Sequence, residues 1–222
     1  MDVILRNIHQ VNDELFFEIE IKNLQRIPGE RRQIDTSGGR LSLTTIRIVN
    51  HLRRLIIGRL PSWCIHRVTD IRNNSFLVDD LVAKRLGQIP VLIAAGTSDE
   101  DIAATQLSLT ARAVEGPEVT IVYSQDVISS NPGVKLMPNI EVMRLREKQE
   151  LKFTALLSKG EGREHTKFCS VGLVSFRPLT VDPNGPYEFK VHLNGNLSAE
   201  ELLAEAFRIF QTDLPVEQVI TA

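Results

Sequence analysis

A long amphipathic helix at the start of residues 41–91 constrains the fold of this chain more than any other feature. Ser42 or Thr44 can cap its beginning by accepting a hydrogen bond from a free backbone N–H group. Pro61 ends it, because proline cannot continue the interior of a helix. The apolar side chains fall at i, i+4, i+7 and i+8 and define a stripe of Ile48, Leu52, Leu55 and Ile56, widened by Val49 and Leu60.

A second amphipathic helix lies near the end of the chain. Ser198 and Glu201 have the spacing of a capping box, in which each side chain satisfies the other residue's backbone N–H. This helix stops before Pro215, and its stripe consists of Leu202, Ala206, Ile209 and Phe210, with Leu203 and Phe207 beside them. Large apolar patches are rarely left exposed on a monomer, so the two helices predict a subunit interface.

Period-two alternation predicts strands around and between these helices. Residues 15–21 alternate apolar and polar side chains, and residues 3–8 are expected to form their antiparallel partner. Further strands are predicted at residues 63–71, 104–113, 119–123, 140–145, 151–157, 168–176 and 189–193. The strands at 104–113 and 119–123 are expected to belong together across the turn at Gly116. A short helix is predicted to open at Asp79 and Asp80 and to end with Gly87 in the left-handed conformation.

Residues 23–40 interrupt the pattern with prolines, glycines and arginines. Arg26, Arg31, Arg32 and Arg40 allow a basic finger that touches nucleic acid or an acidic partner. A solvated connection is the other interpretation, and it is the commoner one for loops of this length.

Composition narrows the class of protein. A net charge of −2 gives no general attraction to nucleic acid, so any role near DNA would run through partners. The chain holds 2 cysteines without CxxC spacing, which excludes a disulfide framework or a four-cysteine zinc site. No apolar run has the length of a signal peptide or a membrane span, so we expect a cytoplasmic or nuclear protein.

Few residues offer catalytic or metal chemistry. His165 lies four positions from Cys169, and Cys64 lies two before His66, but a zinc site needs three or four ligands and a nucleophile needs an oriented base. The acidic residues 99–101 could bind a divalent cation, although such a run is more often a solvated loop. No glycine loop for phosphate is present. The residues alone therefore favour an α+β protein with a subunit interface.

Two ordered blocks of sequence carry a recognisable pattern. The first block consists of residues 50–54 (NHLRR), 60–63 (LPSW), 73–80 (NNSFLVDD) and 83–90 (AKRLGQIP). The second consists of residues 138–146 (PNIEVMRLR), 149–151 (QEL) and 162–168 (GREHTKF). Both blocks resemble the alpha-type subunits of DNA-directed RNA polymerases, a family that includes the archaeal alpha-like chain and the third-largest subunit of eukaryotic polymerase II. Family members typically read Asn-Ala-Leu-Arg-Arg in the first block and Gly-Lys-Glu-His-Ala-Lys-Trp in the second.

The resemblance implies an α+β fold with a discontinuous dimerisation domain at residues 1–61 and 167–222 and an inserted strand-rich domain at 62–166. It also implies a non-catalytic assembly subunit without a cofactor or metal. Its partners would be a smaller alpha-like subunit, the second-largest catalytic subunit and small assembly subunits, with DNA touched only indirectly. The implied partner-interface residues are Arg53, Arg54, Ile48, Leu52, Leu55, Ile56, Phe207 and Phe210, with Arg54 preferred for the catalytic subunit.

The chain also departs from the family pattern. Residues 94–101 carry no cysteines where some relatives hold zinc, and no iron–sulfur domain or bacterial C-terminal DNA-binding domain is expected. His51 replaces the usual alanine and Phe168 the usual tryptophan. These departures suggest a distant branch of the family, and a large DNA virus is one candidate source. A viral source would make the virion a further location for the protein. A stand-alone homodimeric binding module of the same fold is the alternative function, and a small hydrolase using His165 and Cys169 ranks third.

Overall fold

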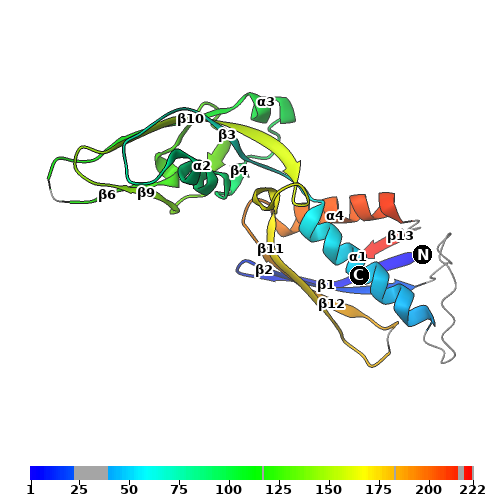
Figure 1. Cartoon of the computed structure of the whole chain (residues 1–222). Coiled ribbons are helices and arrows are strands. Elements are labelled where there is room, and N and C mark those ends of the chain that lie inside the picture. The colour runs from blue at the N-terminus through cyan, green and yellow to red at the C-terminus, as the bar shows by residue number, and fades with distance from the viewer. Residues whose placement is uncertain (23–39, 117, 183, 215–217, 222) are drawn as a thin grey trace. The chain divides into compact units, whose positions relative to one another are not determined.

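The computed structural model describes residues 1–22, 40–116, 118–182, 184–214 and 218–221, with the backbone alone for residues 40–44 and 218–221. The predicted basic loop of residues 23–40 lies outside this described part apart from Arg40. The chain divides into two compact units (Figure 1). Unit 1 comprises Met1–Leu60 and Cys169–Ala222, and unit 2 comprises Pro61–Phe168.

Unit 1 is built on a five-stranded sheet in the order β11-β12-β2-β1-β13. Its neighbouring strands pair antiparallel, except that β13 runs parallel to β1. The strands are β1 (Asp2–Val11), β2 (Glu14–Lys22), β11 (Val171–Pro178), β12 (Tyr187–Leu193) and β13 (Gln218–Thr221). The alternation predicted for residues 15–21 is confirmed, because every second side chain of β2 is buried.

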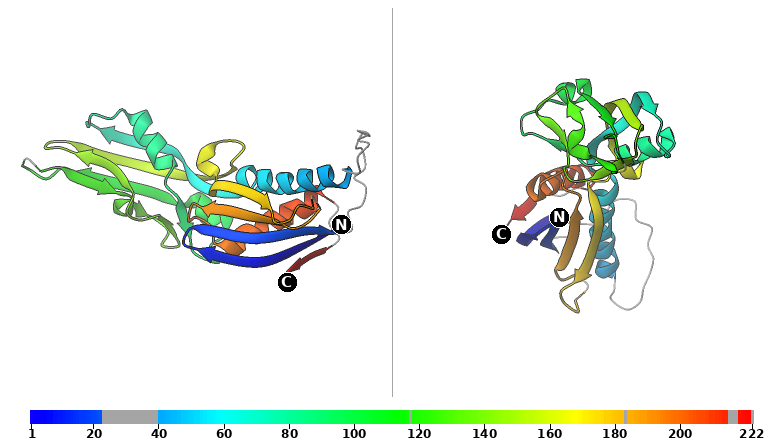
Figure 2. Two further views of the ribbon diagram at one scale, coloured as in Figure 1. Left: turned by 90° about the horizontal axis from the view of Figure 1, so that it is seen from below. Right: turned by 90° about the vertical axis from the view of Figure 1, so that its left-hand side faces the viewer.

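Helices α1 (Arg40–Gly58) and α4 (Ala199–Asp213) pack on that buried side of the sheet, as the views in Figure 2 show. One apolar core takes in side chains from both helices and from β1, β2, β11 and β12. Phe17 of β2 and Phe189 of β12 stack at its centre, with ring centroids 4.9 Å apart. The periodicity of both helices is therefore explained by this core.

Unit 2 contains a four-stranded sheet in the order β3-β10-β5-β7 and two two-stranded ribbons, β4-β8 and β6-β9. Strand β10 is central, since it pairs with β3 along its length and with β5 over residues 150–156. Two helices, α2 (Asp79–Gly87) and α3 (Asp99–Ala104), complete the unit. The strands are β3 (Pro61–Asn73), β4 (Val91–Ile93), β5 (Gln106–Arg112), β6 (Thr120–Tyr123), β7 (Ile128–Ser129), β8 (Val134–Leu136), β9 (Glu141–Leu145) and β10 (Glu150–Glu161).

The α+β class is thus confirmed, with four helices and mostly antiparallel sheets among the described residues. The dimerisation role of unit 1 and the role of unit 2 as an inserted domain stay predictions.

Three local predictions were wrong. Helix α1 begins at Arg40, so Ser42 and Thr44 lie inside it and not at its start. Gly87 does not take a left-handed conformation; it is the last residue of α2, and a Cβ there would lie 3.3 Å from the carbonyl oxygen of Ile65. Close approach of α2 to β3 therefore explains this glycine.

The third error concerns strands β5 and β6. They were expected to belong together, but β5 pairs with β10 and β7, whereas β6 pairs with β9. Sequence neighbours usually pair, and here the longer strand β10 occupies the place beside β5.

The capping box before α4 is confirmed. The Ser198 hydroxyl accepts a hydrogen bond from the Glu201 backbone N–H at 3.2 Å, and the Ser198 backbone N–H donates to Glu201 Oε2 at 2.9 Å. The last helix therefore begins where the sequence predicts.

Candidate partner-binding surface

The apolar stripe of α1 faces the interior of unit 1. Each of its side chains is at most 2% exposed, and those of α4 are at most 8% exposed. These side chains therefore form core and offer almost no surface to a partner in this structure. Six residues predicted for the partner interface belong to this core: Ile48, Leu52, Leu55, Ile56, Phe207 and Phe210.

The outer face of α1 is basic. The helix holds arginines at positions 40, 47, 53 and 54 and no acidic residue. Arg47 and Arg54, seven positions apart and hence on one face, are exposed. Such a face favours contact with acidic side chains or with carbonyl oxygens of another chain.

The two predicted contact arginines differ in their surroundings. Arg53 is half-buried, and its Nε donates to Asn50 Oδ1 on the preceding turn at 2.9 Å. Within the part of the chain that the structure describes, Arg54 makes no hydrogen bond or ion pair. Its five donor N–H groups are therefore available, whereas one of those on Arg53 is already used.

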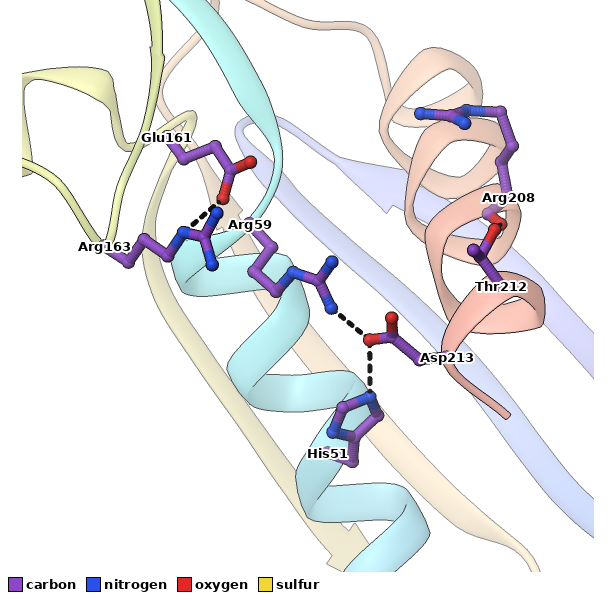
Figure 3. Close-up of polar contacts among 7 residues, drawn as sticks. All are labelled: His51, Arg59, Glu161, Arg163, Arg208, Thr212 and Asp213. Atoms are coloured by element: carbon purple, nitrogen blue, oxygen red, sulfur yellow. Dashed lines mark hydrogen bonds and ion pairs between the residues drawn. The ribbon is translucent and has the colours of Figure 1, made fainter.

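The structure also brings together three residues that the sequence did not link. Asp213, the last residue of α4, accepts hydrogen bonds from His51 of α1 and from Arg59, which follows α1 (Figure 3). These contacts join positions 162 and 154 residues apart, so no local pattern could have revealed them.

The second block of the family resemblance ends at the buried side chain of Phe168. This ring is 4% exposed, and the residue's carbonyl accepts a hydrogen bond from Ser62 Oγ at 2.6 Å. The Lys167 ammonium lies 5.1 Å from the ring centroid and contacts His66 Nδ1 at 2.9 Å. These contacts tie the end of the block to β3 and give it a structural role.

The Cys64 thiol is buried, whereas the Cys169 thiol is only partly buried. Burial raises the pKa of Cys64 to about 11, partly offset by the nearby positive charge of Lys167. Burial also raises the pKa of Cys169. Both groups are protonated near neutral pH, and the thiolate is the nucleophilic form. His165 accepts a hydrogen bond at Nδ1 from the backbone N–H of Lys167.

The acidic run 99–101 is the first turn of α3 and not a loop. Ser98 caps this helix by accepting from the Asp101 backbone N–H at 3.1 Å. Asp99 binds the Lys159 ammonium at 2.6 Å, which lowers the pKa of its carboxyl. Asp99 thus forms an ion pair with β10, and Asp101 supplies the backbone N–H that Ser98 caps.

The described residues offer neither a metal centre nor a membrane span. They hold no group of three or more His, Cys, Asp or Glu side chains placed to bind a metal ion. They also include no helix long and apolar enough to cross a membrane.

Comparison with known proteins identifies the class. No family model matches the chain. It is 31% identical over 206 residues to DNA-directed RNA polymerase subunit Rpo3 of Thermococcus kodakarensis, covering 90% of this chain and 71% of that protein. It is 32% identical over 137 residues to Rpo3 of Pyrococcus furiosus, covering 61% of this chain and 52% of that protein.

A eukaryotic relative agrees with the archaeal ones. The chain is 32% identical over 164 residues to DNA-directed RNA polymerase II subunit rpb3 of Dictyostelium discoideum, covering 64% of this chain and 54% of that protein. The matched regions thus span from about half to seven tenths of these relatives. The chain is thus related to subunits of DNA-directed RNA polymerases. It belongs to the Rpo3/Rpb3 family, as the two sequence blocks predicted.

Proposed function

We propose that this chain is a non-catalytic assembly subunit of a multi-subunit DNA-directed RNA polymerase. It pairs with a smaller alpha-like subunit and binds the second-largest catalytic subunit. The observation that carries the second contact is the outer face of α1, where Arg54 is exposed and makes no hydrogen bond or ion pair with the described residues. A guanidinium fork in that position suits carboxylates or carbonyl oxygens of a partner.

Arg53 supports the same contact in a lesser role. Its hydrogen bond to Asn50 fixes the side chain along the helix, so it borders the surface presented by Arg54. The six apolar residues predicted for the interface would act indirectly, by fixing α1 and α4 in the core of unit 1.

The thiols support a non-catalytic role. With pKa values raised by burial, Cys64 and Cys169 are poor nucleophiles at neutral pH. This disfavours the hydrolase interpretation based on His165 and Cys169, which would need a thiolate nucleophile.

The test uses Arg54→Ala in the full chain, co-expressed with the smaller alpha-like subunit and the second-largest subunit of the same source. We expect the pair with the smaller subunit to remain intact. Capture of the second-largest subunit should weaken by about 2 kcal/mol, roughly thirtyfold in Kd, because a central interface arginine is lost. Affinity is measured by titration of the purified pair against the large subunit.

Arg72→Ala is the matched control, since Arg72 is an exposed arginine of β3 without an ion pair or side-chain hydrogen bond among the described residues. Equal capture by Arg54→Ala and the unmodified chain would refute the assignment of Arg54. A pull-down from the native source that recovers no large polymerase subunits would instead favour the stand-alone homodimeric module.

A further inference from the structure

Asp213 connects the two helices of unit 1 at one point. Its Oδ2 lies 3.1 Å from Nε2 of His51 and also accepts from Nη1 of Arg59 (Figure 3). The Asp213 side chain is 19% exposed, compared with 40% for His51 and 37% for Arg59. The acceptor is thus the most sheltered member, and the Arg59 guanidinium compensates its charge.

The position of Asp213 makes this compensation necessary. The carboxyl end of a helix carries a partial negative charge, so an aspartate in the last turn of α4 is unfavourable by itself. Arg59 follows the carboxyl end of α1, where a cation is favourable. One ion pair therefore relieves the charge at the ends of both helices, and His51 must carry a proton on Nε2 to donate to it.

Phe210 of α4 also packs against α1, with its ring centroid 6.0 Å from that of His51. Two polar contacts near the end of α4 are local to the helix. Arg208 pairs with Glu205 at 2.6 Å, three positions earlier in the same helix, and its side chain is 66% exposed. Thr212 donates to the carbonyl of Arg208. Such contacts stabilise α4 but do not attach it to α1. Leu214 N–H, which bonds to the carbonyl of Phe210 at 3.0 Å, is the last backbone donor of the helix end.

We propose that Asp213 is a positioning residue that locks the carboxyl end of α4 onto α1 through His51 and Arg59. The lock orients the exposed surfaces of the two helices for the smaller alpha-like subunit, and this second part rests on the proposed function.

The test compares Asp213→Asn with Arg208→Ala, a surface variant of the same helix. Hydrogen exchange of the Leu214 amide in the isolated full chain should accelerate by about tenfold in the first variant and stay unchanged in the second. His51→Ala keeps Arg59 as a donor to Asp213 and should therefore give a smaller acceleration of exchange. This variant provides the test if Asp213→Asn does not fold. Unchanged exchange in both the Asp213 and the His51 variants would overturn the lock.

A second measurement addresses the partner. The Kd of the purified smaller alpha-like subunit is determined at a temperature where every variant is fully folded, so that loss of stability alone cannot change it. We expect Asp213→Asn to raise this Kd by about three- to tenfold, about 1 kcal/mol, and Arg208→Ala to leave it unchanged. Faster exchange with an unchanged Kd would overturn the positioning role. Failure of the unmodified chain to bind the smaller subunit would overturn the proposed pairing. The hydrogen-exchange comparison would still test whether Asp213 attaches α4 to α1.

Discussion

Gly160 of β10 provides a sharp test of how unit 2 is packed. A Cβ at this position would lie 2.7 Å from both Cε2 and Cζ of Phe168 and 2.9 Å from Oε2 of Glu164. The ring cannot move away cheaply, because it is buried and the Phe168 carbonyl is held by Ser62. Gly160→Ala should therefore overpack the junction between β10 and the end of the second sequence block.

Overpacking of a well-filled core costs about 1–3 kcal/mol, so we expect a loss near 2 kcal/mol in the unfolding free energy. With a urea m-value of about 1.5 kcal/mol per molar for a unit of this size, the midpoint should fall by roughly 1.3 M. The alanine also gains β propensity over glycine, which would raise stability by less than about 1 kcal/mol and does not reverse the sign.

The assay is urea unfolding of the full chain followed by the fluorescence of Trp63, its single tryptophan. Trp63 reports on unit 2, since it lies on β3 opposite Lys159, whose ammonium is 5.9 Å from the ring centroid. Ser158→Ala is the control, a small change on the same strand expected to shift the midpoint by less than about 0.5 M. A midpoint for Gly160→Ala equal to or above that of the unmodified chain would refute the packing argument.

A double variant separates crowding from backbone effects. Phe168→Leu removes part of the ring volume that the new Cβ would meet. The combination of Gly160→Ala and Phe168→Leu should therefore destabilise unit 2 by less than the sum of the single changes. Strict additivity would mean that the cost of the alanine arises elsewhere.

Two further predictions concern titratable groups. Hydrogen bonds from the backbone N–H and then the hydroxyl of Ser198 lower the pKa of Glu201 in the folded chain, so its ionised form stabilises α4 above its unfolded pKa. This contribution is lost as pH falls through the folded pKa, and Glu201→Gln should flatten the decline of Tm below about pH 5. The Cys64 thiol, with its pKa raised to about 11, should resist iodoacetamide at pH 8 in the folded chain and react in urea, as mass spectrometry would show. Rapid alkylation without denaturant would contradict its burial.

Sequence reasoning found the elements whose periodicity is strong. Strand β2 and helices α1 and α4 each bury a continuous face, so hydrophobic spacing alone located them. Helix α3 was missed because its six residues are too few to show a period and its acidic first turn resembles a solvated loop. The spacing of Ser98 and Asp101 is typical of a helix start, and Ser98 does cap α3. The prediction for this segment did not consider that spacing.

Contacts between distant parts of the chain were not predictable. The pairing of β10 with β5 depends on which strand fills the centre of the sheet, and period-two alternation does not encode a partner. Gly87 shows the same limit, since its role is set by the Ile65 carbonyl of another element. The lock at Asp213 likewise joins residues that share no local motif.

The burial of the α1 stripe decides what kind of contact this helix can offer. Among its described side chains, the core takes Ile48, Leu52, Leu55 and Ile56, while the exposed ones are Ile46, Arg47 and Arg54. A partner that binds this face meets mainly guanidinium groups, and so recognition should depend on electrostatic complementarity more than on apolar area. Contacts of this kind weaken with ionic strength, because salt screens the attraction between exposed charges. The Debye length, beyond which this attraction is largely screened, is about 10 Å at 0.1 M. Capture of the second-largest subunit through α1 should therefore fall steeply with added salt, whereas the apolar core of unit 1 should hold.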